Sequence, residues 1–180
     1  HMLVFPDGGN GVKYIETAFI DEQDEKRQQE WRKAYDYILK KVTYLYGGRQ
    51  LLLKSPENTC RIGALKRCYP GAKFINIYRN PYTVVMSTIN MFTKEMGLFC
   101  LNDPAPYEVI EDVTIDLFER IYKKAFRELE EMPPEDHIDI KYEDFCKDPK
   151  GYVKLIYEHL GIDGFEEAKR YFDAYLESQK

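Results

Sequence analysis

A short apolar run that ends in an arginine carries the clearest chemistry in this chain. The segment KFINIYRNPYTVVMST spans residues 73–88, with Arg79, Asn80 and Pro81 at its centre and Ser87 eight residues after the arginine. This pattern predicts a strand that delivers Arg79 to the N-terminus of a helix beginning at Pro81. The N–H groups at a helix N-terminus and a guanidinium group both attract anions. The segment therefore predicts an anion site, and phosphate is the anion we expect.

Two further polar residues follow apolar runs in the same way. Lys54 comes directly after Leu51–Leu53, and Tyr142 follows the run HIDIK at 137–141. In open α/β sheets, ligands bind beyond the carboxyl ends of the strands. We therefore expect Lys54, Arg79 and Tyr142 to converge on one edge of a sheet.

The elements that must position these residues alternate between strands and helices. Strands are predicted at 51–53, 74–78 and 137–141. Helices are predicted at 24–46, from 58 or 59 to just before Pro70, from 81 to about 96, and at 108–131, 149–160 and 164–177. This alternation is typical of the α/β class, with a parallel sheet flanked by helices.

The helical periods also predict which side chains face the core. Asn58 or Thr59 is expected to cap the second helix, and Gly47-Gly48 and Gly161 are expected to end the helices that precede them. The apolar stripe of the first helix comprises Trp31, Tyr35, Ile38, Val42 and Leu45, of which Trp31, Tyr35 and Ile38 are predicted to be core. The inward residues of the long helix are predicted to be Val109, Val113, Leu117, Ile121, Ala125 and Leu129.

Length and composition narrow the class of protein. The 180 residues are 44% apolar and 32% charged, which indicates one folded domain over residues 3–180, after a vector-derived His1-Met2. The net charge of −5 and the lack of a sustained basic run argue against nucleic acid as a partner. No apolar run is long enough to span a membrane.

The four cysteines have neither zinc-finger spacing nor a favourable disulfide geometry. No pair has CxxC spacing, so no metal site is predicted. Cys60 and Cys68 flank a predicted helix and would lie about 12 Å apart at its rise per residue, too far for a disulfide. Free thiols favour a reducing compartment, and we expect the protein to be cytoplasmic.

Taken together, these motifs resemble those of the sulfotransferases that use 3′-phosphoadenosine 5′-phosphosulfate, in the branch of many bacterial enzymes and the tyrosylprotein sulfotransferases. LLLKSPENTCRI at 51–62 is similar to the family's lysine-proline segment. AKFINIYRNPYTVVMST at 72–88 is similar to its 3′-phosphate-binding strand, loop and helix, and IKYEDFCKDP at 140–149 to its adenine-side strand. The resemblance covers residues 35–180 and implies a P-loop NTPase-like sulfotransferase fold.

The resemblance implies a role for each candidate residue. Arg79 and Ser87 match the pair that grips the 3′-phosphate of the donor, and of the product 3′,5′-adenosine bisphosphate. Lys54 matches a catalytic lysine near the transferring sulfuryl group, where an ammonium offsets the charge that develops on the departing oxygen. Tyr142 matches an aromatic residue beside the adenine ring. The acceptor is a hydroxyl or amine on a small molecule, glycan or peptide, and residues 93–110 are a candidate acceptor-side segment.

The chain also departs from the family pattern. The family's first loop, which cradles the 5′-phosphosulfate, has no counterpart here, and GGNG at 8–11 lacks its basic and hydroxyl residues. Asn58 replaces a histidine often found in the lysine-proline segment, so the base is unassigned. We therefore expect a fragment that is incomplete at the N-terminus. The alternatives are a non-catalytic nucleotide-binding or interaction module and a P-loop small-molecule kinase.

Each candidate residue also has a purely structural interpretation. Arg79 could pair with a carboxylate, Lys54 could be a solvated charge, and Ser87 could be an ordinary helix residue. Tyr142 is one of fifteen tyrosines and could serve only in packing.

Overall fold

The computed structural model describes residues 16–100 and 103–179, and this part of the chain forms two compact units. The helical unit contains the chain up to Pro70 together with Val84–Glu130. The sheet unit contains Gly71–Thr83 together with the chain from Glu131 onward. The predicted vector remnant and the GGNG segment lie outside the described residues.

A two-stranded parallel sheet forms the centre of the sheet unit. Strand β1 (Phe74–Tyr78) pairs with β2 (His137–Lys141), in a register that runs from Phe74 opposite His137 to Tyr78 opposite Lys141. Both strands have the predicted bounds, and their parallel pairing confirms the predicted α/β class.

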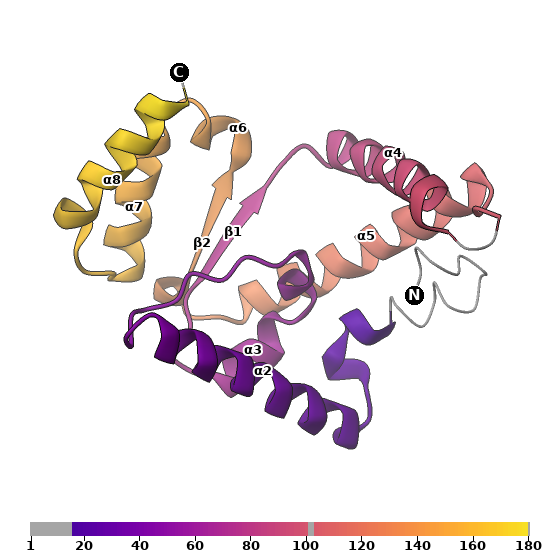
Figure 1. Cartoon of the computed structure of the whole chain (residues 1–180), viewed down its shortest axis with the longest axis horizontal. Helices are drawn as coiled ribbons and strands as arrows, with labels where there is room; N and C mark the ends of the chain where they lie inside the picture. The colour runs from indigo at the N-terminus through magenta and orange to yellow at the C-terminus, as the bar shows by residue number, and fades with distance from the viewer. Residues whose placement is uncertain (1–15, 101–102, 180) are drawn as a thin grey trace. The chain divides into compact units, whose positions relative to one another are not determined.

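Helices that follow β2 in the chain cover one side of this sheet. The short turn α6 (Tyr142–Phe145) leads into α7 (Pro149–Leu160), and α8 (Phe165–Ser178) lies beside α7, as the yellow and orange ribbons of Figure 1 show. Alternate residues of β2 point into this core, where Ile138 and Ile140 are buried against Ile156 and Leu160. This alternation determines which face of β2 is covered by helices, and it therefore also sets the orientation of the polar residues that follow the strand.

Local capping explains where α7 begins and ends. Pro149 occupies the first turn, and the Asp148 side chain accepts a hydrogen bond from the Gly151 N–H at 2.9 Å. Gly161 ends the helix in the left-handed region, with φ of 63°, as predicted from the sequence.

The helical unit is built around a long helix, α5 (Tyr107–Glu130). The other elements are η1 (Ile20–Glu22), α2 (Glu25–Leu45), η2 (Pro56–Cys60), α3 (Ile62–Cys68) and α4 (Pro81–Phe99). The first three residues of α4 belong to the sheet unit and the remainder to the helical unit. The short η3 (Pro134–Asp136) precedes β2 in the sheet unit.

A buried lysine ties three elements of the helical unit together. Lys124 of α5 is 7% exposed and donates to Asp21 Oδ2 at 2.8 Å and to Glu128. Glu128 in turn accepts the Gly63 N–H at 3.0 Å, and Asp21 also pairs with Arg67. A buried charge is tolerated only when it is paired and hydrogen-bonded, and here the partners come from η1, α3 and α5 itself.

The predicted core stripe of α2 was wrong. None of its residues is buried, and Ile38 and Leu45 are 57% and 75% exposed. The N-terminal half does have aromatic neighbours, since Trp31 stacks on Tyr35 at 5.0 Å between ring centroids and Tyr35 contacts Tyr69. An apolar stripe predicts a face that can be buried, but burial requires another element against that face.

The predicted strand at Leu51–Leu53 was also wrong. These residues are irregular, and Leu52 and Leu53 are 86% and 45% exposed. A run of leucines becomes a strand only when its backbone finds a ladder partner, and no strand in residues 16–100 or 103–179 pairs with it.

Two smaller expectations also need correction. Helix α3 begins after Arg61, because Asn58 and Thr59 lie inside the 3₁₀ turn η2 that Pro56 starts, so neither caps it. In α5, Val109 is 44% exposed whereas its neighbour Ile110 is buried, which shifts the inward face by one residue at this end.

Candidate functional site

The residues that directly follow the two paired strands contact one another. Tyr78 lies opposite Lys141 at the end of the ladder. The residues that come next are Arg79, which lies against Tyr142, and Asn80, which lies against Glu143. The site is therefore positioned by the backbone ladder of β1 and β2.

Arg79 lies against the ring of Tyr142. The guanidinium carbon is 5.0 Å from the ring centroid, a cation–π distance. Within the described part of the chain, Arg79 forms no ion pair with a carboxylate. Its exposed guanidinium N–H groups are therefore available to an anion, which argues against the structural interpretation of this arginine.

Tyr142 has a second neighbour in its own short helix. A hydrogen bond with the Cys146 side chain, and the charge of that thiol, raise the pKa of the Tyr142 hydroxyl, and the positive charge of Arg79 opposes the shift. The ring is 40% exposed, so part of its surface is accessible although Arg79 covers one area of it.

Asn80 links the strand to the helix that follows. Its Oδ1 accepts the N–H groups of Tyr82 at 3.0 Å and Thr83 at 3.4 Å, as the N-cap of α4. Its own backbone N–H donates to Glu143 Oε1 at 3.3 Å. The side chain and the backbone N–H of Asn80 are therefore both hydrogen-bonded, and these bonds hold the turn that carries Arg79.

Glu143 is an ionised carboxylate at this junction. Hydrogen bonds from its own backbone N–H and from that of Asn80 lower its pKa, and the charges of Lys141 and Arg79 act in the same direction. Its Oε2 is buried without a hydrogen-bond partner among the residues described.

The other two predicted residues belong to the helical unit. Ser87 is exposed on α4, in its second turn, and its hydroxyl makes no hydrogen bond within the described segments. Lys54 is exposed in the irregular stretch before η2. The structure thus brings Arg79 and Tyr142 together, whereas the convergence of Lys54 and Ser87 with this pair stays a prediction.

Sequence reasoning placed Asn80 at the start of the helix but missed its contact with Glu143, and it missed Glu143 altogether. A signal for both was present, because the predicted strands 74–78 and 137–141 have equal length. Aligning their ends in parallel places Asn80 opposite Glu143. An asparagine directly before Pro81 is also a typical helix start.

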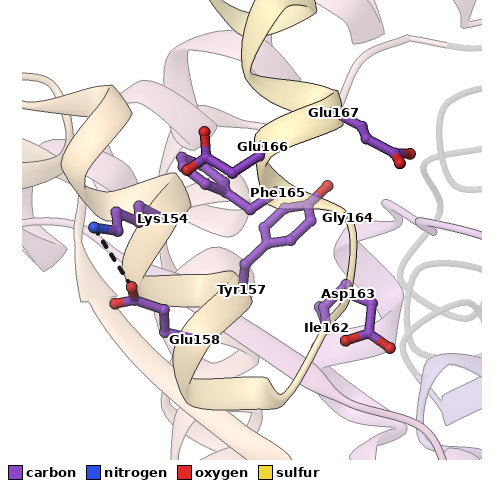
Figure 2. A pocket seen from close by; sticks show the side chains of 9 residues that line it. All are labelled: Lys154, Tyr157, Glu158, Ile162, Asp163, Gly164, Phe165, Glu166 and Glu167. Carbon is purple, nitrogen blue, oxygen red and sulfur yellow. Dashed lines mark ion pairs between the residues drawn. The ribbon is translucent and has the colours of Figure 1, made fainter.

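A pocket of about 420 Å³ lies elsewhere in the sheet unit, at the corner between α7 and α8 (Figure 2). Tyr157, Ile162 and Phe165 line its apolar part, with Tyr157 and Phe165 packed edge to face at 5.5 Å. Glu158, paired with Lys154, is one of several acidic residues around it. None of the four predicted site residues lines this pocket.

The parallel strands and the capped helix α4 place this protein in the α/β class, and comparison with known proteins identifies its family. The model of the sulfotransferase family matches residues 10–167, so this chain belongs to the sulfotransferase family. Membership in this family implies a P-loop-like α/β fold. It also argues against the small-molecule kinase alternative.

Two curated relatives are similar over most of the chain. They are the omega-hydroxy-beta-dihydromenaquinone-9 sulfotransferases of Mycobacterium bovis (strain ATCC BAA-935 / AF2122/97) and Mycobacterium tuberculosis (strain CDC 1551 / Oshkosh), each 28% identical over 164 residues. The matched region is 91% of this chain and 41% of each relative, so the chain spans about two fifths of their length. No solved structure matches significantly. None of the helices described here is both long and apolar enough to cross a membrane.

Proposed function

We propose that this chain carries the 3′-phosphate-binding part of a sulfotransferase that takes 3′-phosphoadenosine 5′-phosphosulfate as its donor. The observation that carries the proposal is the placement of Arg79, at the carboxyl end of β1, one residue before the capped start of α4 and without a carboxylate partner in the described chain. A guanidinium there can bind phosphate oxygens in a bidentate manner. The positive end of the α4 dipole, which begins two residues further on, also favours an anion there.

The remaining roles follow from the family resemblance. Ser87 would add a neutral hydroxyl donor to the same 3′-phosphate. Tyr142 would lie beside the adenine with the part of its ring that Arg79 leaves accessible. Lys54 would act near the transferring sulfuryl group.

The chemistry we propose is an in-line displacement at sulfur. The acceptor oxygen or nitrogen forms a bond to sulfur while the bond from sulfur to the bridging phosphate oxygen breaks, and the acceptor releases its proton. Negative charge grows on the departing oxygen, and the Lys54 ammonium would stabilise it. The product 3′,5′-adenosine bisphosphate keeps the 3′-phosphate that Arg79 holds.

An apolar acceptor with a hydroxyl group is the class that we favour among small molecules, glycans and peptides. On α4, Met91 and Leu98 follow Ser87 by four and eleven residues, so the three share one helix face. Met91 is 44% exposed and Leu98 is 78% exposed. If Ser87 faces the donor, this face continues toward the acceptor with apolar side chains, in or near the predicted acceptor segment 93–110. The two mycobacterial relatives are named for a hydroxylated menaquinone.

Calorimetry with 3′,5′-adenosine bisphosphate and with adenosine 5′-phosphate tests the donor site. We expect the wild type to prefer the bisphosphate clearly. The Arg79→Ala variant should bind the bisphosphate about 10- to 100-fold more weakly than the wild type, as expected for the loss of charge-assisted hydrogen bonds. Arg170→Ala is the matched control, because Arg170 lies over the Tyr171 ring at 4.8 Å in the same unit. Equal affinity for both nucleotides, or an Arg79→Ala protein that binds like the wild type, would refute the assignment.

A further inference from the structure

We propose that Glu143 is a positioning residue of the 3′-phosphate site, which holds the backbone of Asn80 so that the Arg79 guanidinium and the positive end of the α4 dipole keep one fixed arrangement. This inference rests on the proposed function. It assigns a role to a side chain that would not touch the phosphate itself.

The contact joins the two strand ends directly. Glu143 Oε1 accepts the Asn80 N–H at 3.3 Å, just beyond the last residue pair of the β1–β2 ladder. Asn80 lies between Arg79 and the first residue of α4, and its side chain caps that helix. A carboxylate that fixes Asn80 therefore limits movement of the guanidinium before it and of the helix N-terminus after it.

A direct role in binding the anion is excluded by charge. Glu143 is held ionised, so it repels a phosphate. It also lies close enough to Arg79 for the guanidinium to lower its pKa. The carboxylate thus weakens the electrostatic attraction of the site while its oxygen atom fixes the geometry. These two effects have opposite signs and can be separated experimentally.

Two substitutions separate them, because both remove the charge and only one keeps an acceptor. Glu143→Gln retains a side-chain oxygen for the Asn80 N–H, whereas Glu143→Ala does not. We expect Glu143→Gln to bind 3′,5′-adenosine bisphosphate at least as tightly as the wild type. Glu143→Ala should bind it about tenfold more weakly than Glu143→Gln does, the scale of one lost hydrogen bond. The affinity for adenosine 5′-phosphate should be the same in all three proteins, since the effect concerns the 3′-phosphate.

A neighbouring carboxylate gives a matched control. Asp144 lies in the same short helix and pairs with Lys147 at 2.7 Å. Asp144→Asn and Asp144→Ala should therefore have equal affinities for the bisphosphate. Amide hydrogen exchange in the nucleotide-free proteins adds a direct measurement of the contact. The Asn80 N–H should exchange slowly in the wild type and in Glu143→Gln, and faster in Glu143→Ala.

Several results would overturn the inference. Equal bisphosphate affinities of folded Glu143→Gln and Glu143→Ala would show that the acceptor does not matter. A parallel loss of affinity for adenosine 5′-phosphate would indicate a general structural role. Unchanged Asn80 exchange in Glu143→Ala would show that the hydrogen bond does not hold this backbone. Failure of the proposed function is distinguishable, because a wild type without preference for the 3′-phosphate refutes the donor site while the exchange measurement still reports on the contact.

Discussion

Replacement of the buried Lys124 by methionine should destabilise the helical unit strongly. Methionine fills a similar volume but removes the ammonium that Asp21 and Glu128 share. The side chain of Lys124 is 7% exposed, and those of Asp21 and Glu128 are 15% and 13% exposed. Water would therefore compensate the two carboxylates poorly once their shared cation is gone.

The size of the effect follows from these partners. Removing one member of a buried ion pair typically costs about 3–5 kcal/mol. Here the lower end applies, because Asp21 keeps Arg67 and Glu128 keeps the Gly63 N–H. We expect a loss of about 3 kcal/mol, which lowers the urea midpoint by about 1–3 M for the slopes typical of small proteins.

Urea unfolding followed by the fluorescence of Trp31, the one tryptophan in the chain, measures this loss. Trp31 reports on the correct unit, since it lies in α2 with Arg61 over its ring. Lys123→Met is the matched control, because the adjacent Lys123 pairs with Glu119 but is 74% exposed. That change should cost less than about 1 kcal/mol. If the two variants unfold at the same urea concentration, the buried network does not stabilise the unit as argued.

Two further predictions concern a helix end and a thiol. Gly161→Ala should lower the free energy of unfolding by about 1 kcal/mol through backbone strain alone, because φ is 63° and an added Cβ would meet no atom within 4 Å. Gly71→Ala is the control, at an equally open site without a positive φ, and should not lower it. Equal thermal midpoints of the two variants would contradict this prediction. Burial raises the pKa of Cys60 to about 11. At pH 8 the Cys60 thiol should therefore react with a disulfide reagent far more slowly than the exposed Cys146. The difference between the two reaction rates should narrow only as the pH approaches 11. Equal labelling rates of the two thiols, measured by mass spectrometry at pH 8, would show that Cys60 is accessible.

The strands and their ends were predictable because their signals are local. Phe74–Tyr78 and His137–Lys141 are short apolar runs with clear boundaries, and both strands have the bounds that the sequence indicates. The position of Arg79 at a strand end and of Pro81 at a helix start follows from the same local pattern. Family membership was also accessible, since three motifs in order carry the resemblance.

What could not be predicted depends on partners far away in the chain. The leucines at 51–53 and the stripe of α2 have the composition of buried elements, yet burial depends on what packs against them. The pairing of Lys124 with Asp21 joins residues 103 positions apart, and no local pattern indicates it. Glu143 was missed although the equal lengths of the two strands gave a signal, because that signal can be used only once β1 and β2 are known to pair in parallel.

The pairing of β1 with β2 also has a consequence for folding during synthesis. The sheet unit is made of two separate stretches of chain, and Asn80 is made 63 residues before its partner Glu143. At ribosomal speeds of about 5–20 residues per second, the interval between the synthesis of Asn80 and that of Glu143 is roughly 3–13 s. During that interval α4 and α5 are synthesised, while the edge of β1 remains open to other unpaired strands. A nascent chain is therefore most prone to mispairing after Arg79 has been made and before Tyr142 has emerged.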